Sequence, residues 1–178
     1  MFEPKLSTSL VSVEVCDYLP VSGSIYERHY DAGGDCTWVR FELDACEEWM
    51  GVFGICGSNA NSAAAKFADN KHAMVIACGY GYIVDGVTLE LIHKAEREDL
   101  GGVITVPDRD FVVACDNDSL FVYTINGLIW RSRRIALDGI ALISSTDKVL
   151  SGRIEHVDGW YDFTLTFDSW KIDGNTFD

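Results

Sequence analysis

The stretch Phe111-Val-Val-Ala-Cys-Asp-Asn-Asp-Ser-Leu-Phe-Val-Tyr-Thr-Ile-Asn-Gly-Leu-Ile-Trp-Arg131 decides the fold. Its segments 111–115 and 119–125 are rich in β-branched and aromatic residues, which is typical of strands in the interior of a sheet. The turn-forming residues Asp116-Asn-Asp118 separate them. Asn126-Gly127 follows and is the strongest short hairpin signal in the chain. The stretch therefore predicts three consecutive strands joined by tight turns.

Strand signals continue on both sides of this stretch. Alternation of apolar and polar residues predicts half-buried strands over Thr37–Leu43, Thr88–Ile92, part of Lys148–Ile154 and Tyr161–Phe167. One helix is expected near 58–67, where Asn61 or Ser62 can cap the run Ala63-Ala-Ala-Lys-Phe67, since alanine is the best helix former. The chain is therefore expected to be all-β with at most one short helix.

The length of 178 residues fits a single β-rich domain over 1–178, because no linker rich in proline, glycine or serine divides it. A weak echo relates Ile83-Val-Asp-Gly-Val-Thr-Leu89 to Ala136-Leu-Asp-Gly-Ile-Ala-Leu142, but the Asp-Gly spacing is too irregular to establish a repeat. We expect an antiparallel meander that forms a β-sandwich or a propeller-like barrel.

The charge balance excludes some partners. With 28 acidic and 14 basic residues, the formal net charge is -14, so nucleic acid and anionic membranes would be repelled. The excess charge serves either solubility or an acidic face that binds a basic protein partner. The densest acidic stretch, the first candidate surface, contains Asp31, Asp35, Glu42, Asp44, Glu47 and Glu48.

The six cysteines do not form a recognisable metal or disulfide pattern. Their spacing contains no Cys-x-x-Cys pair, and the chain is long enough to fold without disulfides. Cys78 and Cys115 each end an apolar run, and we expect both to be buried free thiols.

Searches for catalytic and cofactor motifs find no complete pattern. Gly79-Tyr-Gly-Tyr-Ile-Val84 lacks the third glycine and the following helix of a dinucleotide site. Gly54-Ile-Cys-Gly-Ser58 lacks the spacing of a nucleophile elbow. Asp116-Asn-Asp-Ser119 continues with Leu120 and Phe121, where a calcium loop needs an oxygen ligand and a glycine. No catalytic residue, cofactor or metal site is therefore predicted.

The segment Gly127-Leu-Ile-Trp-Arg-Ser-Arg-Arg-Ile-Ala-Leu-Asp-Gly-Ile140 supplies the remaining candidates. A regular strand would place Leu128 with Trp130 and Arg134 on one face, where guanidinium stacking could occur. Arg131 would lie on the opposite face. We favour a packing role for Trp130 and pairing of the arginines with acids or carbonyls over an anion-binding site. The candidate binding residues are Trp130, Arg131, Arg134 and Asp138, together with Asp44, Glu47 and Glu48.

The same segment resembles a motif of a family of small β-rich proteins, mainly bacterial and largely uncharacterised. The motif is Gly-Leu-x-Trp-Arg-Ser/Thr, then Arg, then Asp-Gly, and the resemblance covers roughly 75–170. Other matching positions are Gly79–Asp85, Gly152, Trp160, Phe163, Thr164 and Asp168. The chain departs from the pattern at Leu137, where the family often has tryptophan. The resemblance implies a β-rich fold and brings no activity with it.

These observations predict a non-enzymatic, acidic binding protein, for example an immunity-type inhibitor of a basic protein. The alternative is a hydrolase or small-molecule-binding protein with a site near Trp130, Arg131 and Arg134. A cytoplasmic location is expected, because the sequence starts without a basic segment followed by an apolar one.

Overall fold

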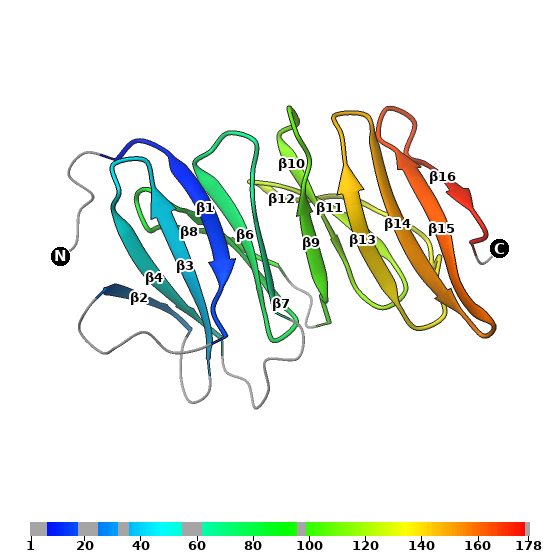
Figure 1. Cartoon of the computed structure of the whole chain (residues 1–178), viewed down its shortest axis with the longest axis horizontal. Helices are drawn as coiled ribbons and strands as arrows, with labels where there is room; N and C mark the ends of the chain where they lie inside the picture. Colours follow the sequence, from blue (N-terminus) through cyan, green and yellow to red (C-terminus); the bar gives the residue numbers. More distant parts are fainter. Residues whose placement is uncertain (1–6, 18–24, 32–35, 55–61, 96–98, 177–178) are drawn as a thin grey trace.

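The residues that the computed structural model describes form sixteen strands arranged in four four-stranded sheets (Figure 1). It describes residues 7–17, 25–31, 36–54, 62–95 and 99–176. Within these ranges the regular structure is entirely β, which confirms the predicted fold class.

Each sheet is formed by four strands that are consecutive in the sequence. The first contains β1 (Leu10–Val15), β2 (Tyr26–Tyr30), β3 (Thr37–Leu43) and β4 (Glu48–Phe53). The second contains β5 (Ala63–Lys66), β6 (His72–Ala77), β7 (Tyr80–Asp85) and β8 (Leu91–Lys94). The third contains β9 (Gly102–Thr105), β10 (Phe111–Cys115), β11 (Leu120–Thr124) and β12 (Gly127–Arg131). The fourth contains β13 (Ile140–Ser145), β14 (Val149–His156), β15 (Gly159–Thr166) and β16 (Lys171–Gly174).

The last three sheets are simple antiparallel meanders, as predicted. The first sheet differs, because its strand order is β1-β3-β4-β2 and β2 runs parallel to β4 at the edge. The Asp116-Asn-Asp118 turn and the Asn126-Gly127 turn join β10 to β11 and β11 to β12 as expected.

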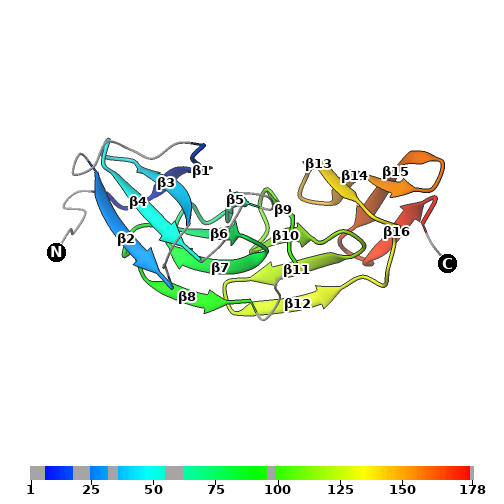
Figure 2. The ribbon, with the colours of Figure 1, turned by 90° about the horizontal axis from the view of Figure 1, so that it is seen from below.

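The four sheets follow one another along an open arc (Figure 2). The first strands of neighbouring sheets, β1, β5, β9 and β13, are in contact along its concave side. The last strands of the second and third sheets, β8 and β12, lie on the convex side. Such a row of sheets, each packed face to face on the next, is propeller-like.

Three apolar cores fill the junctions between successive sheets. The core between the first and second sheets includes Trp49 and Tyr82, and the core between the second and third includes Met74 and Phe121. The third and fourth sheets pack through a core that includes Phe163. Each sheet therefore contributes one face to each junction that it borders.

Burial patterns distinguish the central sheets from the end sheets. All residues of β10 are buried, because its side chains enter the second junction and the third junction alternately. In β3 and β15, buried residues alternate with partly exposed ones, because one face of each end sheet has no neighbouring sheet. The alternation read from the sequence thus corresponds to the two ends of the arc.

Side chains also join the first strands of successive sheets. Lys66 Nζ donates to the carbonyl oxygen of Val11 at 3.0 Å, and Thr105 Oγ1 donates to the carbonyl oxygen of Lys66 at 2.7 Å. Ser145 Oγ donates to the carbonyl oxygen of Thr105 in the same way. One hydrogen bond of this kind therefore crosses each of the three junctions.

The expectations about Ala63–Lys66 and about Cys78 are wrong. Ala63–Lys66 forms strand β5 instead of a helix, because pairing with β6 and packing between β1 and β9 outweigh the helix propensity of alanine. Cys78 is disulfide-bonded instead of free. Cys115 is the buried free thiol that was predicted.

Candidate functional site

Strand β12 contains a bulge at Ile129 that places Leu128 and Trp130 on opposite faces of the sheet. Val122 of β11 pairs with Trp130, whereas the next residue, Tyr123, pairs with Leu128, so that Ile129 is the extra residue. Trp130 therefore shares the Val122 face, toward the fourth sheet, and Arg131 shares the face of Phe121 and points toward the second sheet. The expected placement of Leu128 on the same face as Trp130 is wrong, because the bulge reverses the alternation.

Trp130 lies in the junction between the third and fourth sheets. Its ring stacks on Trp170 with centroids 5.1 Å apart and planes inclined by 18°. Trp170 also contacts Phe111 and Phe167 at 5.8 Å and 6.2 Å between ring centroids. These contacts give Trp130 the packing role that we favoured from the sequence.

Arg134 fixes the connection between β12 and β13. Its Nε and one terminal nitrogen donate to the carbonyl oxygens of Ala136 and Leu137 at 3.0 Å and 2.8 Å. Its Nε also lies 3.6 Å from Asp118 Oδ2, at the β10–β11 turn. Asp138 is exposed in the bend just before β13. Arg134 thus binds carbonyls and an acid, as favoured from the sequence.

Arg131 lines a hollow between β8 and β12 with a volume of about 530 Å³. Its guanidinium carbon lies 5.2 Å from the centre of the Phe121 ring, an arrangement that allows a cation–π contact. The hollow, called here the Arg131 pocket, is lined by His93, Ala95, Phe121, Tyr123, Asn126, Gly127, Leu128 and Arg131. It combines a buried aromatic floor with two groups, Arg131 and His93, that can bind an anion.

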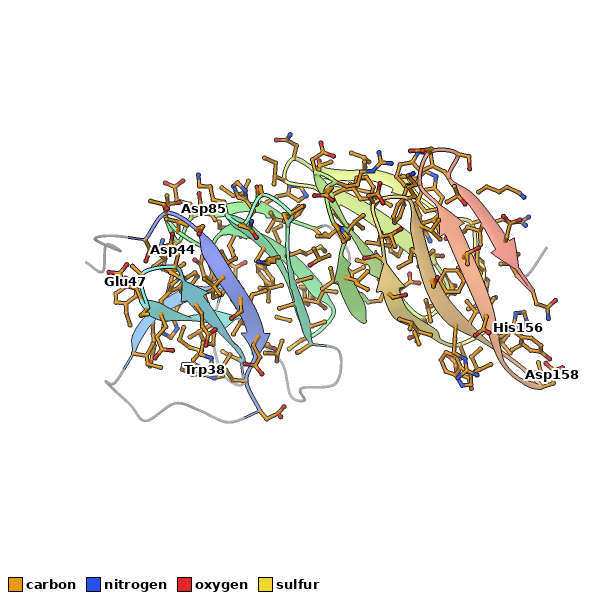
Figure 3. All side chains as sticks on the ribbon, turned by 45° about the horizontal axis from the view of Figure 1, so that its top comes forward. Trp38, Asp44, Glu47, Asp85, His156 and Asp158 are labelled. Atoms are coloured by element: carbon orange, nitrogen blue, oxygen red, sulfur yellow. The ribbon has the colours of Figure 1, made fainter. Side chains whose placement is uncertain are left out.

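The acidic candidates Asp44 and Glu47 hold the segment that precedes β1 (Figure 3). Asp44 accepts hydrogen bonds from the backbone N–H of Thr8 at 3.0 Å and from its hydroxyl at 2.9 Å. These bonds from Thr8 lower the pKa of the Asp44 carboxyl. Glu47 accepts a hydrogen bond of 2.6 Å from the hydroxyl of Ser7. Both carboxylates therefore have a structural partner.

The third acidic candidate, Glu48, lies on the outer face of the first sheet, which has no neighbouring sheet in the arc. The alternation of β3 and its pairing with β1, β4 and β2 place several charged groups on this face. They are Glu14, Glu27, His29, Arg40, Glu42 and Glu48. Arg40 lies 2.7 Å from Glu14 and 3.7 Å from Glu42. Among the described residues on this face, four are carboxylates and one, Arg40, is a permanent cation.

Solved structures of other proteins share this arrangement of sheets. The WD40 domain of Neurospora crassa Pan2 matches with a TM-score of 0.53 and 10% identity, over 79% of this chain and 47% of that chain. A chain of a mitotic checkpoint complex matches with a TM-score of 0.58 and 9% identity, over 97% of this chain and 57% of that chain. The chain has a propeller-like fold.

A chain of a nidogen–laminin complex is a further match, with a TM-score of 0.53 and 13% identity, over 77% of this chain and 57% of that chain. The propeller-like chain thus spans about half the length of the solved chains that it matches. No family model and no curated protein matches the sequence, so the resemblance to the bacterial family stays a prediction.

Sequence reasoning missed the residues that the fold brings together on different sheets. His93 and Arg131 come from the last strands of two sheets, and only the face-to-face packing of these sheets makes them neighbours. Glu14 and Glu27 lie outside the acidic stretch that was singled out, and strand pairing places them beside Glu42 and Glu48. Of the stretch itself, Asp31 binds Lys94 at 2.7 Å, and Asp35 lies outside the described residues.

Clusters of metal-ligating side chains and membrane-spanning helices are both absent from the part of the chain that the structure describes. No group of three or more His, Cys, Asp or Glu side chains is arranged to hold a metal ion. No described helix is long and apolar enough to cross a membrane.

Proposed function

We propose that the protein is a non-enzymatic binding protein whose outer face on the first sheet binds a basic protein partner. The observation that carries this proposal is the direct pairing of Glu42 with Glu48 across β3 and β4. Like charges at paired positions of a sheet destabilise it. Basic side chains of a partner placed over this pair would remove the repulsion and gain charge-assisted hydrogen bonds.

The overall charge supports the same partner chemistry. A formal net charge of -14 attracts a basic protein over several ångströms and raises its association rate. Two of the solved structures with a similar fold are protein complexes, of nidogen with laminin and of the mitotic checkpoint. An arrangement of sheets like this one can therefore serve protein binding.

The finer form of the proposal is an immunity-type inhibitor, which neutralises a basic protein by covering its functional surface. A cytoplasmic location belongs to this form and stays a prediction from the sequence. The disulfide at Cys78 bears against it, because disulfides persist mainly in oxidising compartments.

The Arg131 pocket favours a second candidate function, the binding of a small molecule. The described residues that line it include His93 and Asn126 but no cysteine, serine or carboxylate that could act as a nucleophile. The alternative function predicted from the sequence was a hydrolase or a small-molecule-binding protein. This lining favours the small-molecule-binding protein. Trp130 and Arg134 do not line this pocket, because they lie in the third junction and the following connection.

Affinity purification with two charge-matched variants tests the protein-binding proposal. The first variant changes the carboxylates of the outer face and carries Glu14→Gln, Glu27→Gln, Glu42→Gln and Glu48→Gln. The control variant changes exposed carboxylates elsewhere and carries Asp108→Asn, Asp162→Asn, Asp168→Asn and Asp173→Asn. Each raises the formal net charge of -14 by four, so the two variants differ only in where the charge is removed.

We expect the wild type and the control variant to retain the same basic protein at low salt, and the outer-face variant to lose it. Quantitative mass spectrometry of the eluates provides the measurement, and circular dichroism shows that each variant is folded. Equal retention by both variants would overturn the assignment to this face. Capture of no basic protein by the wild type would overturn the proposed function itself.

A further inference from the structure

The side of each junction that lies on the convex side of the arc is called its rim here. Specific contacts close the rims of the first and third junctions. In the first junction, Tyr30 Oη donates a 2.7 Å hydrogen bond to the carbonyl oxygen of Leu89. Trp49 Nε1 donates at 2.8 Å to the carbonyl oxygen of Gly86 in the same junction. In the third junction, the stacked rings of Trp130 and Trp170 occupy the equivalent place. Large aromatic side chains therefore fill both outer junctions as the sheets diverge.

Among the described residues, the rim of the second junction contains a hollow instead of an aromatic contact of this kind. The Arg131 pocket lies there, between β8 and β12, and its volume of about 530 Å³ is within the range of sites for small organic ligands. Phe121 and Tyr123 form its floor and are almost fully buried, so they close the pocket from below. Leu128 keeps 49% of its surface exposed at the mouth.

The pocket also contains a cation, Arg131, for which the described residues supply no counterion. Among the described residues, no carboxylate lies within ion-pair distance of Arg131, although acidic side chains outnumber basic ones two to one in the chain. The guanidinium carbon of Arg131 lies 5.2 Å from the centre of the Phe121 ring, which belongs to the apolar floor of the pocket. An Arg fork held beside an apolar floor is the geometry that binds a carboxylate in two parallel hydrogen bonds.

The absence of a side chain at Gly127 leaves room for the His93 ring at the pocket. This glycine has a φ of +116°, and a Cβ atom at its position would lie 3.1 Å from His93 Nε2. The imidazole therefore packs directly against the backbone of the β11–β12 turn. Its ring and the amide of Asn126 add two groups that can hydrogen-bond to an oxyanion.

We propose that the Arg131 pocket binds a small organic carboxylate with an apolar body. Arg131 holds the carboxylate, His93 and Asn126 orient it, and the apolar body rests against Ala95 and Leu128. A singly charged ligand is favoured over a phosphate dianion, because the net charge of -14 repels a dianion about twice as strongly. Burial of the apolar body then supplies affinity that does not depend on charge.

Three probes separate the contributions of charge and of the apolar body. Phenylacetate has both, phenylacetamide has the same body without charge, and inorganic phosphate has charge without the body. Amide shifts in ¹H–¹⁵N NMR spectra, recorded during titration, give the affinity and the location of each probe. We expect phenylacetate to shift the amides of Asn126 and Leu128, with phenylacetamide and phosphate at least about ten-fold weaker.

Three variants test the location. Arg131→Gln removes the cation, and Leu128→Trp fills the mouth from an exposed position. Arg153→Gln is the matched control, since Arg153 is exposed on the outer face of the fourth sheet, where it lies 3.5 Å from Asp162. The first two are expected to weaken phenylacetate binding by about ten-fold or more, and the control to leave it unchanged.

Several results would overturn the proposal. They are equal binding of phenylacetate and phenylacetamide, stronger binding of phosphate than of phenylacetate, unchanged affinity in both pocket variants, and the absence of shifts at millimolar phenylacetate. A fold check by thermal unfolding accompanies each variant. If Arg131→Gln is unfolded, Leu128→Trp decides the outcome.

Discussion

The Thr105 hydroxyl donates a 2.7 Å hydrogen bond to the carbonyl oxygen of Lys66, across the junction between the second and third sheets. Both residues end the first strand of their sheets, and Ser145 ends β13 in the same position. Their side chains all donate to a carbonyl of the preceding sheet. A polar side chain at this position therefore helps to set the spacing between successive sheets, although one is lysine, one threonine and one serine.

Removal of the Thr105 hydroxyl should destabilise the fold without changing its architecture. Thr105→Val preserves shape but leaves the partly buried carbonyl oxygen of Lys66 without this donor, which costs about 1 to 2 kcal/mol. Thr164→Val, on the outer face of the fourth sheet, is the matched control, because Thr164 is a strand residue on a face without a neighbouring sheet. Urea unfolding followed by circular dichroism measures both. Equal stabilities of the two variants would show that the inter-sheet hydrogen bond contributes nothing.

Asp85 should link stability to acid pH. Its carboxylate is 3% exposed and lies 2.9 Å from Lys71 Nζ, and the backbone N–H groups of Val87 and Thr88 each donate to it at 2.8 Å. Burial alone would raise the pKa of Asp85, but the interactions with Lys71, Thr88 and Val87 outweigh it and lower the pKa below 3.8. Because the folded-state pKa is depressed, this stabilisation is present above pH 4 or so and is lost as the pH falls through the folded-state pKa.

Asp85→Asn is therefore expected to cost about 1 to 3 kcal/mol at neutral pH, because the charge that binds Lys71 is lost. The difference from the wild type should shrink at acid pH, below about 4, as Asp85 itself takes up a proton. Asp162→Asn changes an exposed carboxylate of the fourth sheet and serves as the control. Urea unfolding at both pH values gives the comparison. A difference that stays constant with pH would contradict the assigned shift.

The sequence predicted strands correctly where the pattern of apolar residues and the flanking turn residues indicate the same local structure. Phe111–Cys115 was predicted as a central strand and is β10, and Tyr161, Phe163 and Leu165 do face one core in β15. Strand β5 was not predictable, because alanine favours a helix unless neighbouring strands provide pairing. The bulge at Ile129 has no sequence signature, so the placement of Leu128 and Trp130 on opposite faces emerged only from the register.

Cysteine reactivity should follow burial. Burial raises the pKa of the Cys115 thiol to about 12, and its side chain is 2% exposed. Since the thiolate is the nucleophile, iodoacetamide at about pH 8 should label the exposed Cys46 in the native protein and reach Cys115 only after unfolding. Cys78 should remain unlabelled until a reductant is added. Peptide mapping by mass spectrometry measures each site, and rapid labelling of Cys115 in the native protein would contradict the buried position.

The Trp130–Trp170 stack should couple the third and fourth sheets energetically. Trp130→Ala and Trp170→Ala each remove a large packed ring and should cost about 3 kcal/mol or more. In the double variant the two costs should fall short of additivity by about 0.5 to 1.5 kcal/mol, the usual worth of an aromatic pair beyond its buried area. Guanidinium chloride unfolding of the four proteins measures this coupling. Strict additivity would mean that the rings do not stack in solution, and Trp130 would then be available as a binding residue.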